Sequence, residues 1–538
     1  MITNNMLKRR DFIRSLLGAG AVGALGPVGQ LALMREATAA TPAFSDYKAL
    51  VCIFLYGGND SFNMVIPNGD DSVKGYAQYQ SIRGSLAVAD TELDYRSLNA
   101  YHVDNTEEKA YRQGMYSLQG KGIDLGINAV MPELAELVNK DKASVISNIG
   151  NLVKSVDRAS VRDGKDLPLF LFAHNHQQRA LQTGQGNNLN DVGWAGRIAD
   201  NWSDVNGSSP LGLNISYAGS DRMLIGKTSV PLAIKAGATP VYNDMEKDKN
   251  NTETDRRALF RALAGLENAS STGNLNFNNT NTFQTSDPFR AFYGAAARKS
   301  LDVFDLLTDA LGAHTITYSS KDSYGNDLFS VPTADQLGFG NDIGGGLIRE
   351  MESVARMIDI GAKNAFGGSA HNRQIFMVKL GGFDTHSAQI SKHPLLLREL
   401  SLALGKFQAA LEERGHANKV TTFTMSDFGR TMSNNGDGTD HAWGAHHLVI
   451  GGDGDKLAGN LRGGQMIGTL PDISLDGADD YSAKGRIIPT IAQDQLNATL
   501  CRWFGVDNDL MPVIFPNLSN FGTIDSAAGS AYLNDLFV

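Results

Sequence analysis

Apolar segments with the length of buried strands alternate with amphipathic helical patterns along this sequence, and that alternation leaves few architectures open. The run Ala49–Tyr56 is continuously apolar and stops at Gly57-Gly58-Asn59-Asp60, as a strand buried on both faces does where it enters a loop. Apolar residues spaced by three and four across Leu396–Leu411 predict an amphipathic helix. We predict four further strands: Ala143–Ile149, Gln374–Leu380, Val420–Met425 and His447–Ile450. The pattern predicts an α/β fold, a mostly parallel sheet with helices on both faces.

The length of the chain, 538 residues, allows either several domains or one large α/β domain with insertions. We expect the second arrangement over residues 41–538. Between about residues 250 and 342 the composition changes to Asn- and Thr-rich stretches, followed by a helical pattern near Phe289–Leu311. We interpret this segment as an inserted cap region.

Charge and cysteine content exclude two classes of function. Lys and Arg total 48 against 58 for Asp and Glu, a net charge of −10, so the chain does not attract polyanions and nucleic acid is not an expected partner. The two cysteines, Cys52 and Cys501, are too few for a thiolate zinc cluster. Any metal would therefore be bound by histidines and carboxylates.

The first forty residues are typical of an export signal. Lys8-Arg9-Arg10 precedes a Gly- and Ala-rich apolar stretch that ends in Ala37-Thr38-Ala39-Ala40. Arg9-Arg10 followed by Asp11-Phe12-Ile13 resembles the twin-arginine consensus, which implies export of the folded protein by the twin-arginine machinery to the periplasm or beyond. The alternatives are a general signal peptide or an N-terminal anchor, but six Gly and Pro residues between positions 18 and 29 weaken a membrane helix. We expect no transmembrane segment after residue 40.

Four groups of polar residues with metal-binding chemistry follow three of the predicted strands, the last two groups in succession after Val420–Met425. In parallel α/β folds, ligands collect at the carboxyl ends of the strands, so these residues converge on one edge of the sheet. Of the 11 histidines, six lie within the 62 residues from His386 to His447. Carboxylate and imidazole ligands suit Zn²⁺ or Mn²⁺, singly or as a pair of ions. The candidates are Asp60 and Ser61, Asp384 and His386, Asp427 and Arg430, and His441 and His446.

The order of these motifs resembles the alkaline phosphatase superfamily, which includes phosphatases and sulfatases. The mature chain resembles more closely an uncharacterised bacterial family of twin-arginine-exported relatives, the domain-of-unknown-function 1501 family. The matching motifs are Phe54–Asp60, Leu171–Asn175, Gly193–Arg197, Gly382–His386, Ser426–Arg430 and Gly438–His441. The resemblance implies an alkaline-phosphatase-like α/β fold.

The resemblance also implies roles for the candidate residues. Asp384 and His386, with His441 or His446, would hold one divalent ion (Zn, Mn or Ca), and Asp60 and Asp427 would hold a second. In the superfamily a Ser, Thr or formylglycine is the nucleophile. The sulfatase signature for formylglycine is missing from this sequence.

This sequence departs from the family pattern at two positions. Phe428 follows Asp427 where phosphatases have a His, and Ala173 precedes His174 where relatives often have a Ser. Ser61 and Thr385 are the hydroxyls left nearby, and water activated by the metal is the other nucleophile that fits.

Each candidate also has an ordinary structural explanation. Asp60 and Asp427 are residue types that cap helices, and His446 and His447 begin an apolar strand in which a histidine packs. Arg197 and Arg430 either clamp an anionic group or form structural ion pairs. If their segment is extended, His174 and His176 share a face and reach a ligand; otherwise they pack.

The sequence therefore predicts an exported, metal-binding α/β protein that hydrolyses a phosphate or sulfate ester carried by a small molecule or a polymer. Metal ligands would be Asp60, Asp384, His386, Asp427, His441 and His446, and Ser61, Arg197 and Arg430 would act on the substrate. The alternative hypothesis is a non-catalytic secreted binding or envelope protein that keeps the fold.

Overall fold

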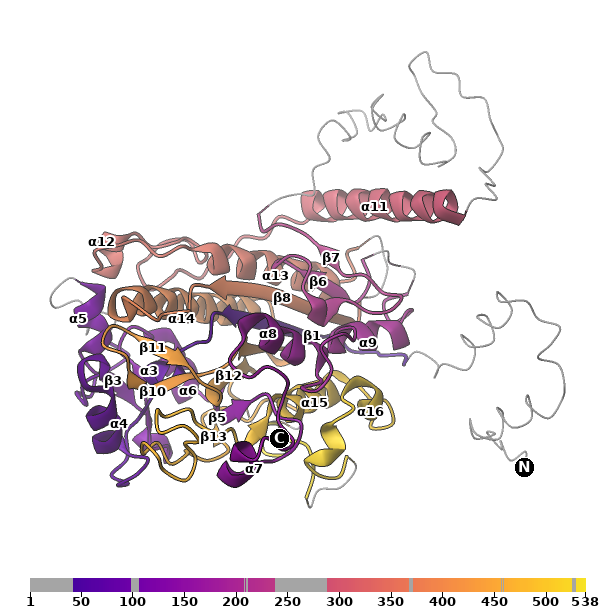
Figure 1. The fold of residues 1–538 in the computed structure, drawn as a ribbon. Helices are drawn as coiled ribbons and strands as arrows, with labels where there is room; N and C mark the ends of the chain where they lie inside the picture. The colour runs from indigo at the N-terminus through magenta and orange to yellow at the C-terminus, as the bar shows by residue number, and fades with distance from the viewer. Residues whose placement is uncertain are drawn as a thin grey trace, which may run out of the picture.

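The computed structural model describes residues 42–97, 106–207, 209, 211–237, 288–366, 371–455, 457, 459–524 and 529–538, with the backbone only for 288–300. Within these residues a nine-stranded sheet runs through the molecule (Figure 1). Its order is β13 (Met466–Ile467), β5 (Ala143–Gly150), β12 (Ala445–Gly451), β9 (Val420–Ser426), β1 (Lys48–Tyr56), β8 (Arg373–Gly381), β6 (Asn214–Ser216) and β7 (Leu232–Ala233), with β14 (Ile491–Ala492) also paired to β5.

Most neighbouring strands of this sheet are parallel. β1 lies between β8 and β9 and is parallel to both, and its last residue, Tyr56, is in register with Gly381 at the end of β8. β12 is antiparallel to both β9 and β5. The carboxyl ends of β1, β8 and β9 consequently meet at one edge, as the sequence predicts.

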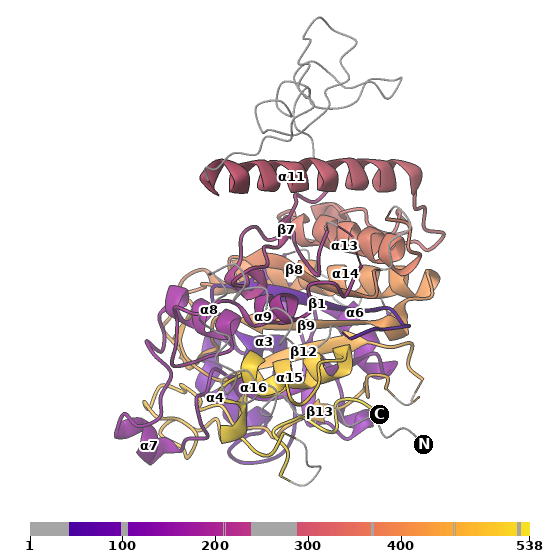
Figure 2. The same cartoon turned by 90° about the vertical axis from the view of Figure 1, so that its right-hand side faces the viewer.

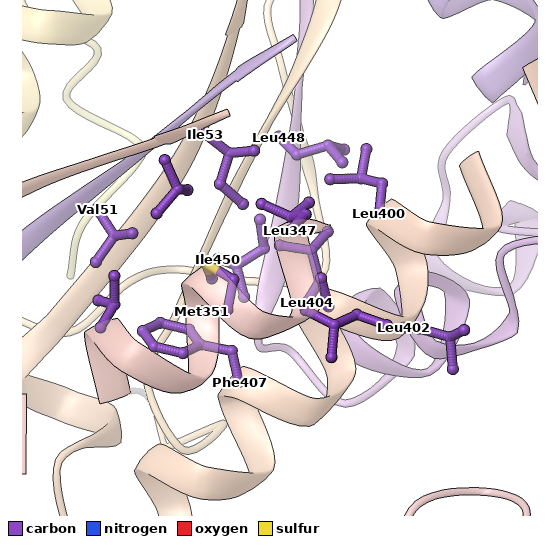
Figure 3. Packing of buried hydrophobic residues seen from close by; sticks show 14 of the residues in the cluster. Val51, Ile53, Leu347, Met351, Leu400, Leu402, Leu404, Phe407, Leu448 and Ile450 are labelled. Atoms are coloured by element: carbon purple, nitrogen blue, oxygen red, sulfur yellow. The ribbon is translucent and has the colours of Figure 1, made fainter. Parts of the chain in front are cut away.

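Side chains of β1 alternate between two hydrophobic cores. Ala49, Val51, Ile53 and Leu55 belong to the core on one face, and Leu50, Cys52 and Phe54 to the core on the other. Figure 3 shows the first core, where Val51 and Ile53 of β1 meet side chains of two helices. Burial on both faces explains why this segment is continuously apolar rather than alternating.

Helices cover both faces of the sheet (Figure 2). The first core contains residues of α6 (Pro132–Asn139), α13 (Gly346–Ala362), α14 (Gln389–Glu413) and the second half of α11 (Pro288–Ala313). The second contains residues of α9 (Trp194–Asn201), α15 (Gln493–Phe504) and α16 (Met511–Ile514). The remaining α-helices are α3 (Ser61–Met64), α4 (Tyr76–Arg83), α5 (Glu107–Arg112), α7 (Arg158–Arg162), α8 (His174–Thr183) and α12 (Ala334–Leu337).

Short elements complete the fold. A three-stranded antiparallel sheet has the order β2 (Val65–Pro67), β4 (Leu125–Asn128), β3 (Met115–Ser117). A hairpin of β10 (Arg430–Asn434) and β11 (Thr439–His441) follows β9 and places Arg430 opposite His441. The 3-10 turns are η2 (Gly84–Leu86), η3 (Gln119–Lys121), η4 (Arg222–Leu224), η5 (Ala417–Lys419) and η6 (Leu518–Asn520).

The largely parallel, mixed α/β architecture predicted from the sequence is confirmed. All five predicted strands are present, and the predicted helix across Leu396–Leu411 is part of the longer α14. The predicted signal segment, residues 1–40, and residues 238–287 of the expected insertion and its approach lie outside the described residues. Among the helices that the structure describes, none is long and apolar enough to cross a membrane.

His393 supplies a pH-dependent part of the stability. It is buried in α14 and hydrogen-bonds the Tyr111 hydroxyl (2.8 Å) and Asn59 Oδ1 (2.9 Å). Burial lowers the pKa of His393 to about 4, so the folded state keeps it neutral where the unfolded chain, with a pKa near 6.5, takes up a proton. This contribution is complete above pH 6.5 and is lost as the pH falls toward 4.

We therefore expect His393→Gln to flatten the pH dependence of unfolding. Between pH 6.5 and 4 the slope of the unfolding free energy should fall by up to about 1.4 kcal/mol per pH unit relative to the parent protein, because one proton fewer is taken up on unfolding. Urea titrations across this range measure the slope. An unchanged slope would contradict the assignment.

Candidate metal centre

Three chain segments bring four polar side chains together beyond the carboxyl ends of β1 and β8. The loop after β8 carries Asp384 and His386, and β11 ends at His441. His174 is the first residue of α8. All four side chains are partly exposed, from 22% for His441 to 49% for Asp384, so the cluster is open to solvent on one side.

Nitrogen and oxygen atoms in this cluster lie at ligand-to-ligand distances. His441 Nε2 is 3.0 Å from His174 Nε2 and 2.8 Å from His386 Nε2. Asp384 Oδ1 is 3.1 Å from His386 Nε2, 3.3 Å from His441 Nε2 and 3.5 Å from His174 Nε2. Tetrahedral zinc with bonds near 2.0–2.1 Å separates its ligand atoms by about 3.4 Å. The spacing is therefore close to that of a metal-binding cluster.

The second nitrogen of each ring faces a hydrogen-bond acceptor. His174 Nδ1 is 2.6 Å from Asp427 Oδ2, His386 Nδ1 is 3.2 Å from Asp440 Oδ1, and His441 Nδ1 is 2.8 Å from the carbonyl oxygen of Phe172. An acceptor at Nδ1 places the proton there and leaves a lone pair on Nε2 of the neutral ring. Three such lone pairs directed at one another repel, and a cation between them removes the repulsion. The same carboxylate–histidine arrangement orients metal-bound histidines in proteins.

Arg430 fixes the position of Asp384. Its guanidinium is fully buried and donates to Asp384 Oδ1 at 2.5 Å. Burial alone would raise the pKa of Asp384, but the hydrogen bond and charge of Arg430 outweigh it and hold the pKa at about 2. Asp384 is therefore an anion at any ordinary pH. Burial lowers the pKa of His441, which favours the neutral ring that a metal needs.

Asp427 lies on the buried side of the cluster and hydrogen-bonds His174. It is 1% exposed, and its Oδ2 atom accepts from His174 Nδ1, from Gln178 Nε2 at 3.0 Å and from the Gly57 amide at 3.2 Å. Its neighbour Phe428 lies against the rings of His174 and His441, with centroids 4.7 and 4.6 Å away. In this arrangement Asp427 orients a histidine.

Three other predicted residues lie in a separate buried region. Asp60 is fully buried and binds Arg83 through both oxygens, at 2.6 and 2.9 Å, and also accepts from Gln389. Ser61 Oγ accepts from the backbone amide of His446 at 2.8 Å. The His446 ring is fully buried, with its Nδ1 3.3 Å from the Asn148 amide. The structure does not bring these side chains into the His441 cluster.

The two predicted arginines have structural partners. Arg197 lies in α9 and donates to the carbonyls of Thr183, Val192 and Ile514. Arg430 donates to the carbonyls of Gly57, Gly58, Phe383 and Thr439 in addition to Asp384. Both side chains are buried, and these bonds engage every nitrogen of each guanidinium.

His174 joins the cluster although sequence reasoning left its role open. Its segment is not extended: α8 begins at His174, and the His176 ring packs against Phe170 instead, with centroids 4.3 Å apart. The helix has Ala173 at its N-cap and no side-chain cap. The positive end of α8 therefore lies at the cluster, where it favours an anion.

Comparison with known proteins supports the predicted family. Residues 364–511 match the model of a family described as a protein of unknown function (DUF1501). The matched region contains Asp384, His386, Asp427 and His441 but not His174. No curated protein matches the chain.

Asp427→Asn tests whether the hydrogen bond from His174 Nδ1 to Asp427 contributes to metal binding. The amide cannot supply the charge that balances the His174 Nδ1 proton, so we expect the zinc affinity of the purified chain to fall about 10- to 100-fold while the fold is kept. Competition with a chromogenic chelator measures the affinity. Asp453→Asn, at an exposed carboxylate that accepts from Asn418, is the matched control and should leave the affinity unchanged. Equal affinities for both variants would contradict the role of Asp427.

Proposed function

We propose that His174, Asp384 and His441 bind one divalent metal ion beside His386, and that the protein uses this ion to hydrolyse a phosphate or sulfate ester. The observation that carries the proposal is the set of Nδ1 acceptors, which leaves Nε2 of each histidine free, together with ligand atoms of His174, Asp384 and His441 that all lie within 4.8 Å of one another. Such an arrangement has no hydrogen-bonding purpose of its own, and it fits a cation.

The donor set favours zinc. Two imidazoles and one carboxylate, with a third imidazole beside them, suit Zn²⁺ best, with Mn²⁺ second, whereas Ca²⁺ takes mainly oxygen ligands. A single ion is favoured over a pair, because Asp60 is already bound by Arg83 and Phe428 stands where a second ion would need a ligand.

Ester hydrolysis is the chemistry that this site supports best. A bound Zn²⁺ acidifies a water molecule and polarises the oxygen of an ester. Partial exposure of the four side chains leaves room for a substrate on the solvent side. The positive end of α8, next to His174, favours an anionic group such as a phosphate or sulfate.

The positions of the nearby hydroxyl groups and of Arg430 indicate which group attacks the ester. Ser61 is buried beside the His446 amide, and Thr385 is 1% exposed, so neither hydroxyl reaches the open side of the cluster. Attack by water, without a covalent intermediate, is therefore the route that fits. Arg430 positions Asp384 and does not meet the substrate. The twin-arginine pattern at residues 9–10 supports a periplasmic or secreted setting.

A specific observation favours the second candidate, a non-catalytic secreted protein with a structural metal. His386 Nε2 lies 3.1 Å from Asp384 Oδ1 and 2.8 Å from His441 Nε2, so it is placed to be a fourth protein ligand. Four protein ligands close a tetrahedral zinc site, whereas catalytic zinc keeps a position open. Bound metal without turnover of any ester would therefore support the non-catalytic protein with a structural metal.

The decisive variants are His174→Ala and His176→Ala. His174→Ala removes one Nε2 ligand, and we expect zinc affinity to fall by at least about 100-fold, together with any turnover. His176 lies on the same helix but packs against Phe170, so His176→Ala should keep both. Elemental analysis gives zinc per chain, and chromogenic phosphate monoesters, phosphate diesters and sulfate esters give turnover. A His174→Ala protein with full zinc content would overturn the proposed site.

A further inference from the structure

A small buried cavity lies behind the metal cluster, at the carboxyl edge of the main sheet. Its volume is about 10 Å³, enough for one water molecule. The ends of β5, β9 and β12 and the first residue of α15 surround it, and every residue lining it is buried. Leu181, Phe428 and Trp443 form its apolar part.

Three polar side chains that line this cavity each have an atom without a hydrogen-bond partner among the described residues. These atoms are Asp427 Oδ1, His447 Nδ1 and Gln493 Oε1. The three side chains are 1%, 3% and 1% exposed. Buried polar atoms in folded proteins nearly always have a hydrogen-bond partner, so three unpaired ones around one cavity point to a shared partner.

We propose that the cavity binds one water molecule, which bridges Asp427, His447 and Gln493. Water has two protons to donate, to Asp427 Oδ1 and Gln493 Oε1, and a lone pair to accept a proton from His447 Nδ1. Each atom that lacks a partner is then satisfied once, and three bonds are the usual number for an internal water. Gln493 Nε2 already donates to Asn497 Oδ1 at 3.1 Å, which leaves its oxygen free for the water.

The water links the start of α15 to the metal cluster. Asp427 uses Oδ2 to hold His174 and Oδ1 to hold the water, so both oxygens are fixed. A carboxylate held at both oxygens cannot turn away from His174 Nδ1. Gln493 and His447 are therefore positioning residues for a metal ligand that they do not touch.

A crystal structure of the full chain, grown without added metal, tests the water directly. We expect one density peak about 2.7–3.2 Å from the three atoms. Contacts of about 2.0–2.6 Å with anomalous signal would mean a metal ion, and no peak would mean a dry cavity. Either result would overturn the proposal. Because this crystal needs no zinc, failure of the proposed metal site would not obscure the result.

Gln493→Leu tests the link to the cluster. It removes one acceptor at similar volume, and we expect zinc to bind about 3- to 10-fold more weakly, less than for loss of Asp427 itself. Gln408→Leu is the matched control, because Gln408 is 2% exposed and donates to Gly452 and Glu412 far from the cavity. It should lower stability and leave zinc affinity unchanged. Unchanged affinity in Gln493→Leu, or an equal loss in both variants, would overturn the link.

Discussion

One buried guanidinium holds together the edge of the sheet on which the candidate site lies. Arg430 donates to Gly57 and Gly58 at the end of β1, to Phe383 and Asp384 after β8, and to Thr439 in β11. These segments are far apart in sequence, and a single side chain donates to all of them. Gly57 has φ +116°, and a Cβ there would lie 2.4 Å from the Asp384 amide, so only glycine lets the loops approach this closely.

The hydrogen-bond acceptors outside the cluster determine which nitrogen of each histidine carries the proton. If a hydrogen-bond donor faced Nδ1 of His174, His386 or His441, Nδ1 would accept and the proton of the neutral ring would lie on Nε2, pointing at the neighbouring side chains. The groups that face Nδ1 are instead acceptors, namely Asp427, Asp440 and the Phe172 carbonyl, so the proton lies on Nδ1 and Nε2 keeps its lone pair. Metal binding in this protein would therefore depend as much on three acceptors outside the cluster as on the ligands.

Strand-end reasoning could reach part of the site from sequence. Asp384, His386 and His441 follow strands whose ends meet at one edge, and the structure does bring them together. Asp60 also follows a strand, but its carboxylate turns to Arg83, 23 residues further on in α4, and periodicity carries no information on that pairing. The sequence leaves the role of His174 open, because only the tertiary packing of α8 places its first turn against Asp427. Residue type and strand position thus predict the edge, while side-chain direction depends on partners that are distant in sequence.

Two features of this geometry argue against a second metal ion beside the cluster. At position 428 a phenylalanine ring lies against two of the histidines, so the space beside Asp427 is filled by carbon and excludes a second cation there. Asp60, the other carboxylate that a second ion would use, is neutralised by Arg83 within a region that is fully buried. Because a metal ligand introduced at position 428 would leave Asp60 bound to Arg83, a single substitution at Phe428 cannot create a two-metal centre. The proposed site is therefore a one-ion site, and the proposed reactivity would depend on that ion and on the acceptors that orient its ligands.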